Sequence, residues 1–379
     1  MRRLLPLLCG LLLAACGQRA ARPIGDFTLP VYTPRYASGF EITGAAGSRS
    51  TLVTVHNPWY GDEVTDQYLC IARDGEPAPA GFEGQVLRDE ARRVVCMSGS
   101  YIAMLDALGA ADRVVGVSGA QYLINETLRR RIARGEAADV GFDSNVDFER
   151  LMALRPDLVM LFGIGGADTA LTGKLRELGI PYLYMGEHCE ESPLGKSEWV
   201  VVAAEIAGLR TEGSRLFAAI PERYERLRAL AQQTAARPRV MLNTPYRDTW
   251  FMPARNSYMV RLLEDAGARY VFEENTATQT LPIDIEQAYY LTSKSDFWLN
   301  VSGCNTLDEV RRQNPRLADT PPVREGRVYD NNRRRNAAGG SDFWESGVLR
   351  PDRVLADLVH IFHPELSETD ELYYYRQLE

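Results

Sequence analysis

Two stretches of the chain share one arrangement of residues: DFERLMALRPDLVML at residues 147–161 and DIEQAYYLTSKSDFWLN at residues 284–300. In each, a glutamate follows two residues after an aspartate, a leucine follows five residues later, and a second aspartate precedes an apolar run. An aspartate before an apolar-periodic segment is typical of a helix N-cap, and a short apolar run is typical of a buried strand. The sequence therefore predicts the same helix–strand unit in two places.

The similarity extends to the residues before each unit. An apolar run at 94–97 corresponds to one at 240–243, and SYIAMLDALGA from Ser100 corresponds to SYMVRLLEDAGA from Ser257. Short apolar strands that alternate with helices indicate a mostly parallel sheet with both faces covered. Since these features recur in the same order, we predict an α/β protein of two related lobes. The alternative is that two ordinary strand–helix units have similar sequences by chance.

A long segment with few helix breakers separates the two copies. Within residues 196–236, Gly208 and the Gly213–Ser214 pair are the residues that would weaken a continuous helix. Pro221 would kink it. A helix of this length would run roughly 50 Å or more at 1.5 Å per residue. Such a helix does not fit inside one compact domain, so we predict that it connects the two lobes. Ligands of open parallel sheets bind beyond the carboxyl ends of the strands, so a ligand cleft is expected between the lobes.

The first sixteen residues have the features of an export signal. Arg2 and Arg3 precede a short apolar run, and LAAC ends this segment at Cys16. The run is too short for a membrane span of roughly 20 residues. LAAC resembles the bacterial lipobox, which implies an acylated Cys16 that anchors the protein to a membrane. An ordinary signal with an incidental Cys16 is the alternative.

These observations predict five parts of the chain. The parts are a signal peptide (1–15), a lipidated tether (16–36), an N-terminal α/β lobe that begins with two or three antiparallel strands (37–195), a connecting helix (196–236) and a C-terminal α/β lobe (237–379).

Composition excludes several classes of protein. The 379 residues exceed the usual size of one hydrophobic core, and the net charge of −8 argues against a nucleic-acid partner. The chain has only four histidines, so we expect no resident metal or cofactor. Outside the signal, four cysteines are widely spaced without a CxxC motif, and no disulfide is predicted among Cys70, Cys96, Cys189 and Cys304.

From roughly residue 90 to residue 363 the chain resembles the helical-backbone class of ABC-transporter substrate-binding proteins. The motifs that carry the resemblance are DFERLMALRPDLVML, SEWV at the start of the long segment, IEQA in the second lobe and the stretch at 339–366. This class captures ferric siderophores, haem and vitamin B12. The resemblance implies a monomeric, exported, lipid-anchored protein that delivers a ferric siderophore-type complex to an ABC permease dimer; in a Gram-negative cell it would lie in the periplasm. Vitamin B12 (cobalamin) and haem are the alternative ligands.

By position, Glu149 and Glu286 match the glutamates with which this family docks onto arginines of the permease. A binding protein with two equivalent lobes offers one equivalent charge per lobe to a twofold permease. The alternative is that Asp147 and Asp284 are N-caps and that the glutamates only complement the helix dipoles.

Candidate ligand contacts lie in loops after the predicted strands. The flat or bulky face of an iron chelate or macrocycle needs aromatic walls, and its anionic groups need arginine. The predicted contacts are Ser98, Tyr101, Tyr122, Tyr246, Arg247, Trp250 and Arg333.

A hydrolase is the alternative from another class. GEHCEESP, at residues 186–193, places His188 beside Cys189 and so resembles a nucleophile with its base. Working Cys–His pairs normally assemble from distant segments of a chain. We therefore expect no enzyme activity, and we expect this stretch to line the mouth of the cleft or to lead into the connecting helix.

Overall fold

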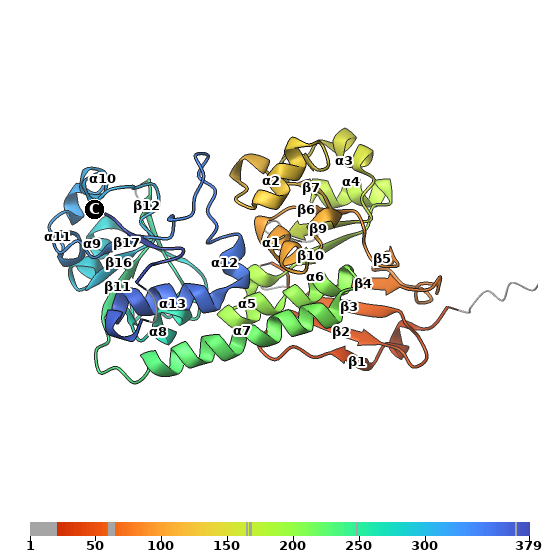
Figure 1. Ribbon diagram of the computed structural model, residues 1–379, viewed down its shortest axis with the longest axis horizontal. Helices are drawn as coiled ribbons and strands as arrows, with labels where there is room; N and C mark the ends of the chain where they lie inside the picture. Colours follow the sequence, from red (N-terminus) through yellow and green to blue (C-terminus); the bar gives the residue numbers. More distant parts are fainter. Residues whose placement is uncertain (1–20, 60–64, 164–165, 167–168, 248, 368–369) are drawn as a thin grey trace, which may run out of the picture.

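The computed structural model describes residues 21–59, 65–163, 166, 169–247, 249–367 and 370–379. Two α/β lobes lie side by side, and a long helix runs along the edge of both (Figure 1). The predicted fold class is therefore confirmed. The predicted signal peptide and Cys16 lie outside the described residues.

The first lobe is built on five parallel strands in the order β10-β9-β6-β7-β8. All residues of its middle strand are buried, because helices cover both faces of a parallel sheet. The strands are β6 (Val94–Cys96), β7 (Val114–Val117), β8 (Ala138–Asp139), β9 (Leu158–Phe162) and β10 (Tyr182–Met185). The helices between them are α1 (Gly99–Ala107), α2 (Glu126–Ala133), α3 (Phe148–Leu154) and α4 (Ala170–Leu178).

The second lobe has a sheet in the order β14-β11-β16-β17-β18, in which only β18 runs antiparallel to its neighbour. Its strands are β11 (Arg239–Leu242), β14 (Arg269–Tyr270), β16 (Phe297–Leu299), β17 (Val328–Asp330) and β18 (Arg376–Gln377). A small antiparallel sheet contains β12 (Pro245–Tyr246), β13 (Thr249–Met252) and β15 (Leu281–Ile283). The helices are α8 (Tyr258–Asp265), α9 (Ile285–Ser293), α10 (Leu307–Gln313) and α11 (Pro321–Arg324).

The sequence repeat is a structural repeat. In the first lobe β6 lies between β7 and β9, and in the second lobe β11 lies between the corresponding strands β14 and β16. The acidic helices α3 and α9 precede β9 and β16. Asp147 accepts a hydrogen bond from the Arg150 N–H at 2.9 Å, and Asp284 accepts one from the Gln287 N–H at 2.8 Å. Both aspartates are therefore N-caps.

The single connecting helix predicted at 196–236 is wrong, because the segment forms α5 (Pro193–Glu198), α6 (Val200–Ile206) and α7 (Arg210–Ala231). Gly208 has φ +66°, a left-handed conformation that glycine adopts without strain, and it follows the end of α6. Helix α7 then packs against α6, and a Cβ at Gly213 would lie 2.3 Å from the Ala204 Cβ. Glycine thus permits the close approach, and α7 alone spans roughly 33 Å between the lobes.

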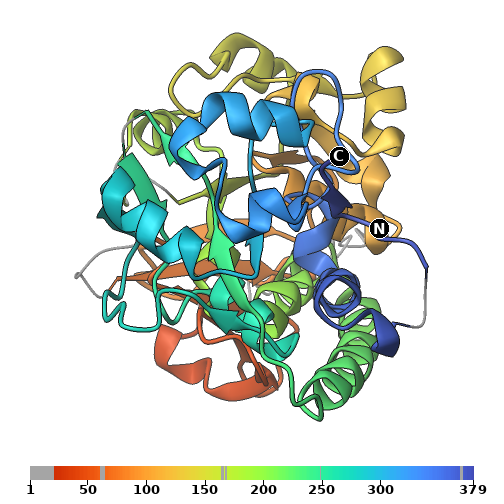
Figure 2. The same ribbon diagram turned by 90° about the vertical axis from the view of Figure 1, so that its left-hand side faces the viewer.

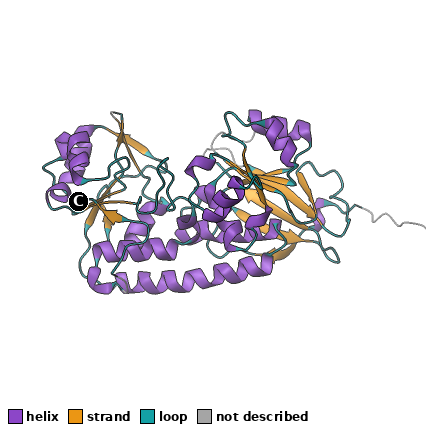
Figure 3. Ribbon diagram, turned by 45° about the horizontal axis from the view of Figure 1, so that its top comes forward, coloured by secondary structure: helices purple, strands orange, loops and turns teal. Residues whose placement is uncertain are grey.

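The chain after β17 returns to the junction of the lobes. Helix α12 (Ser346–Leu349) packs against α1, and α13 (Pro351–Phe362) lies beside α7 in two views (Figures 1 and 2). An ion pair joins Arg223 of α7 to Asp352 of α13, with Nε 2.7 Å from Oδ2. Figure 3 shows the long helix beneath two groups of strands, one in each lobe.

The N-terminal strands form a sheet of their own, in the order β1-β2-β3-β4-β5. They are β1 (Leu29–Tyr32), β2 (Phe40–Gly44), β3 (Thr51–His56), β4 (Asp66–Ala72) and β5 (Gln85–Arg88), of which only β4 and β5 pair in parallel. The sequence predicted two or three strands and a tether that reaches residue 36. The sheet has five strands, and β1 begins inside the predicted tether.

Buried glutamates of the connecting segment hold this sheet. Glu198 of α5 accepts hydrogen bonds from the backbone N–H groups of residues 35–37, each at 2.8 Å. Glu190 accepts hydrogen bonds from the backbone N–H groups of residues 38 and 39. Glu205 of α6 accepts one from the Thr51 hydroxyl at 2.6 Å. These contacts fix the sheet on α5 and α6.

The described residues contain no helix that is both long enough and apolar enough to cross a bilayer. Cys70, Cys96, Cys189 and Cys304 are free thiols.

Candidate functional site

A cavity of about 490 Å³ lies between the lobes, beyond the carboxyl ends of β10 and β11. The cavity lies where the sequence predicts a ligand cleft, at the strand ends. From the first lobe, residues 188–191 after β10 line the cavity. From the second lobe it is lined by Asn243, Phe251, Pro253, Ala254, Asn256, Ser257, Tyr258, Thr278, Gln279 and Thr280.

The first-lobe wall is a single 3₁₀ turn at Glu187–Cys189. Glu187 is buried, and its Oε1 accepts a hydrogen bond from the Ser100 hydroxyl at 2.9 Å. The Lys196 ammonium is also buried and donates to the Glu187 carbonyl oxygen at 2.9 Å. These contacts anchor the turn to α1 and α5, so the wall of the cavity is fixed by buried polar groups.

The surroundings of His188 favour its protonated form at neutral pH. Burial lowers the pKa of His188, but the neighbouring Cys189 and Glu187 outweigh it and raise that pKa to about 9. The His188 Nε2 lies 3.0 Å from the Gly163 carbonyl oxygen. Because Nε2 faces the Gly163 carbonyl oxygen, the orientation of the His188 ring in the cavity wall is fixed.

The second-lobe wall offers mainly amide and hydroxyl groups. Asn243, Asn256 and Gln279 supply amides, and hydroxyls come from Ser257 and the neighbouring threonines and tyrosine. Among the described residues that line the cavity there is no arginine and no lysine. The wall therefore suits a ligand whose outer groups are uncharged hydrogen-bond donors and acceptors.

One direct contact crosses the cavity from lobe to lobe. The Asn256 amide donates a hydrogen bond to the Glu191 carboxylate. Asn256 precedes α8, and Glu191 follows β10. This contact joins the two lobes at the cavity.

Two predicted ligand contacts belong to the core. Tyr101 on α1 is 0% exposed and donates a hydrogen bond to the Leu161 carbonyl oxygen at 3.2 Å. Trp250 on β13 is 1% exposed and donates through Nε1 to the Leu242 carbonyl oxygen at 2.9 Å. Its ring lies 5.6 Å from that of Trp298, centroid to centroid. The prediction is wrong for both residues, because each aromatic ring packs inside its lobe and satisfies its polar atom there.

The other predicted contacts also lie outside the interlobe cavity. Ser98 is the N-cap of α1 and accepts a hydrogen bond from the Ser100 N–H. Tyr122 and Tyr246 are exposed, and the Arg247 guanidinium lies 5.3 Å from the centre of the Tyr246 ring. The remaining residue, Arg333, forms an ion pair of 3.1 Å with Glu371. The structure thus does not bring the seven predicted contacts together.

The residues that line the cleft were mostly missed from sequence. Asn243 follows directly after β11, so its position at a strand end could have identified it as a cleft residue. The other missed residues, Thr278, Gln279 and Thr280, precede the small strand β15. No local sequence pattern indicates that β15 pairs with β13. The stretch at 186–193 was expected to line the mouth of the cleft or to lead into the connecting helix, and its residues 188–191 do line the cavity.

The two glutamates predicted to dock lie on different lobes. Glu149 is in the first turn of α3, and Glu286 is in the first turn of α9. Both are exposed. Glu286 forms an ion pair with Arg316 at 2.9 Å, whereas Glu149 has no ion-pair partner within the described part of the chain. The two carboxylates are thus accessible at equivalent positions of the repeat.

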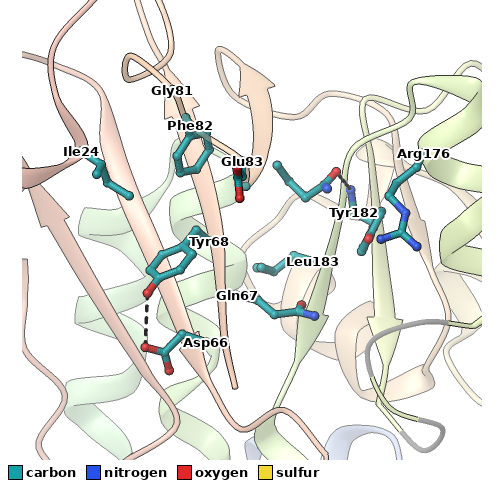
Figure 4. Close-up of a pocket in the computed structure, with 12 residues that line it drawn as sticks. Ile24, Asp66, Gln67, Tyr68, Gly81, Phe82, Glu83, Arg176, Tyr182 and Leu183 are labelled. Carbon is teal, nitrogen blue, oxygen red and sulfur yellow. Dashed lines mark hydrogen bonds between the residues drawn. The ribbon is translucent and has the colours of Figure 1, made fainter. Parts of the chain in front are cut away.

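A separate cavity of about 480 Å³ lies where the N-terminal sheet meets β10 (Figure 4). Tyr68 of β4 and Phe82 of the β4–β5 connection line it on one side, and Arg176 and Tyr182 line it from the first lobe. The Tyr68 hydroxyl donates to Asp66 at 3.3 Å. No described residue of the second lobe lines this cavity, so it is distinct from the cleft.

Comparison with known proteins gives a consistent result. The sequence profile of the periplasmic binding protein family matches residues 94–333. An uncharacterized lipoprotein of Methanocaldococcus jannaschii is 25% identical over 332 residues, which cover 82% of this chain and 77% of that protein. A second uncharacterized lipoprotein of the same organism is 22% identical over 330 residues, which cover 83% of this chain and 81% of that protein.

Solved structures share the fold. A periplasmic haem-binding protein from Pseudomonas aeruginosa has a TM-score of 0.58 at 20% identity, and the match covers 76% of this chain and 98% of that one. A periplasmic binding protein from Veillonella parvula has a TM-score of 0.59 at 15% identity, covering 82% and 98%. A protein of an ABC-type Fe³⁺-hydroxamate transport system from Saccharomonospora viridis has a TM-score of 0.54 at 17% identity, covering 72% and 94%.

Proposed function

The chain belongs to the periplasmic binding protein family, and from this premise we propose that it captures a ferric siderophore-type iron complex for an ABC importer. Membership confirms the resemblance inferred from the repeated motifs. The chain is a substrate-binding protein of an ABC-type uptake system. The proposal adds three parts: the class of the ligand, the lipid anchor and the docking residues.

The observation that carries the proposal is the cavity of about 490 Å³ between the lobes. Its volume is within the roughly 300–1,000 Å³ of small-ligand sites. It lies where the strand ends of both lobes meet, so a ligand there contacts both halves of the repeat. Proteins of the same fold bind haem or belong to Fe³⁺-hydroxamate transport, and these names support an iron complex as cargo.

The chemistry of the cavity favours a complex with an uncharged surface. A ferric trihydroxamate presents amide and carbonyl groups, which the amides of Asn243, Asn256 and Gln279 can match. Haem carries two propionates, and these would face Glu191 without a lining arginine or lysine. The one cationic group in the described lining is His188, and its Nε2 already contacts the Gly163 carbonyl oxygen. Vitamin B12 is the second candidate, because its peripheral amides would meet the same amide side chains.

Docking to the permease is assigned to Glu149 and Glu286. Each carboxylate is exposed in the first turn of an equivalent helix, one on each lobe. Exposed charges of this kind set the orientation and rate of an encounter more than its affinity. On the second lobe, Glu286 would exchange its present partner Arg316 for an arginine of the permease.

Calorimetric titration of residues 17–379, which include every described element, tests the proposed ligand. The probes are ferrichrome as an uncharged ferric trihydroxamate, a ferric tricatecholate, haem and cyanocobalamin. Sub-micromolar binding of ferrichrome, weakened at least tenfold by Gln279→Ala and unchanged in the control Gln313→Ala on α10, is the expected result. Binding of haem or of the tricatecholate alone would overturn the ligand assignment, and binding of cyanocobalamin alone would establish the second candidate.

A further inference from the structure

A segment of the second lobe crosses to the first lobe at the opening between them. We define it as the strap, residues 331–345, which connects β17 to α12. The strap turns back on itself at an antiparallel bridge between Arg335 and Ser341. Figures 1 and 2 both show this loop beside the residues that lead into α2.

The tip of the strap lies directly on the first lobe. The Asn336 amide donates hydrogen bonds to the Gln121 carbonyl oxygen at 2.9 Å and to the Leu123 carbonyl oxygen at 3.2 Å. A Cβ at Gly340 would lie 1.7 Å from the Tyr122 carbonyl oxygen. Only glycine fits at this point, so the backbones of the two lobes are in contact.

The base of the strap is held by one carboxylate. Glu345 is 6% exposed and accepts hydrogen bonds from the backbone N–H groups of Ile124 at 2.9 Å and Asn125 at 2.6 Å. Asn125 is the N-cap of α2 and accepts a hydrogen bond from the Leu128 N–H. A side chain of the second lobe thus completes the start of a first-lobe helix.

The charged groups around Glu345 do not neutralise it. Asp342 of the strap and Asp106 of α1 face it, and both are acidic. The nearby cation Arg334 is already bonded to Asp342 at 2.6 Å. Burial raises the pKa of Glu345 to about 7, the N–H groups of residues 124 and 125 oppose this rise, and Asp342 and Asp106 add to it.

We propose that Glu345 is a positioning residue for the ligand cleft. Its carboxyl group fixes the strap to the first lobe and thereby holds the two lobes at the separation at which the ligand binds. The proposal rests on the proposed function in one respect, because it assumes that the ligand occupies the interlobe cavity.

The attachment of the strap depends on pH in a definite direction. When the strap detaches, Glu345 becomes hydrated and its pKa returns from about 7 toward 4.5. The attached state therefore binds a proton more tightly than the detached state. These pKa values predict that attachment is strongest below pH 4.5, weakens as the pH rises from 4.5 to about 7, and changes little above that. At high pH the ionised carboxylate must lose its hydration to re-enter the contact.

Hydrogen exchange tests the strap without any ligand. In residues 17–379, protection of the amides of Ile124 and Asn125, corrected for intrinsic rates, is expected to fall by roughly tenfold between pH 6 and pH 8.5. Glu345→Ala should remove this protection at every pH, and Glu345→Gln should make it independent of pH. The control Glu371→Gln, which removes the exposed partner of Arg333, should behave as the native chain.

Titration with ferrichrome at the same pH values separates the two proposals. Loss of protection in Glu345→Ala together with at least tenfold weaker ferrichrome binding supports the positioning role. Loss of protection with unchanged binding overturns that role. If no probe binds the native chain although exchange behaves as expected, the proposed ligand is wrong and the strap still fixes the lobes. Protection in Glu345→Ala equal to that of the native chain overturns the inference.

Discussion

Replacing Glu198 by alanine would remove the acceptor of four hydrogen bonds that hold the N-terminal sheet on α5. Three of the donors are the backbone N–H groups of Arg35, Tyr36 and Ala37, and the fourth is the Tyr32 hydroxyl, all at 2.8 Å. Glu198 is fully buried, so bulk water cannot replace its carboxylate as the hydrogen-bond acceptor. The three N–H groups would lose their acceptor together.

The magnitude follows from the number and kind of these bonds. A hydrogen bond to a charged group contributes about 1.5–3 kcal/mol, and four such bonds give an upper limit. Removing the carboxylate also removes the cost of burying its charge, which offsets part of the loss. We expect local attachment of the sheet to weaken by about 3–5 kcal/mol, because each buried donor left without an acceptor costs about 1–3 kcal/mol and part of the sum is offset.

Hydrogen exchange at residues 35–37 measures this loss directly. At 1.4 kcal/mol per factor of ten, exchange should accelerate by about a hundredfold to a few thousandfold. Glu198→Gln, which keeps one carbonyl oxygen as acceptor, should give an intermediate value and serves if the alanine variant fails to fold. The control Glu177→Ala removes only the exposed pair with Lys174 and should change exchange little. Acceleration of less than threefold in Glu198→Ala would refute the reasoning.

Three further results are expected. Glu149→Arg combined with Glu286→Arg should abolish uptake in a transport assay and leave the Kd for ligand unchanged; a changed Kd would show that these helices form part of the ligand site. The purified native chain and Cys189→Ala should hydrolyse an ester substrate equally slowly; hydrolysis by the native chain that is lost in Cys189→Ala would establish the enzyme alternative. Trp250→Ala should destabilise the second lobe by about 3–5 kcal/mol in urea unfolding, because the indole fills the core; near-native stability with lost ligand binding would restore its predicted role.

The repeat made the fold predictable from sequence. The aspartates at 147 and 284 act as N-caps through hydrogen bonds to residues three positions later, which is a local interaction. The order of strands around β6 and β11 follows from the same order of apolar runs in each half. Local chemistry repeated in register was therefore enough to predict two related lobes.

The connecting segment shows where local reasoning stops. Gly208 was recognised as a weak point of the helical pattern, but a glycine can either continue a helix at some cost or end it. In this chain α7 packs against α6 at Gly213 and Ala204, and this packing requires the helix to end near Gly208. That contact forms only after the chain has reversed, so the local pattern could not reveal it.

The ligand site was predictable in position but not in composition. Placing the cleft at the strand ends needed only the direction of the strands. Trp250 lies on a strand that pairs with β15, and this pairing turns the indole into the core and brings residues 278–280 to the cavity. Which side chain of a loop faces a cavity depends on such distant pairings.

The attachment of the N-terminal sheet to α5 and α6 makes the two ends of the molecule mechanically unequal. Buried hydrogen bonds join the sheet to α5 and α6, and the described chain begins at the end of the first lobe away from the second lobe (Figure 1). A lipid at Cys16 would therefore be connected to the first lobe and not directly to the second. Lengthening the chain between Cys16 and Ile24 would then extend the distance that the protein can reach from the membrane without altering the cleft.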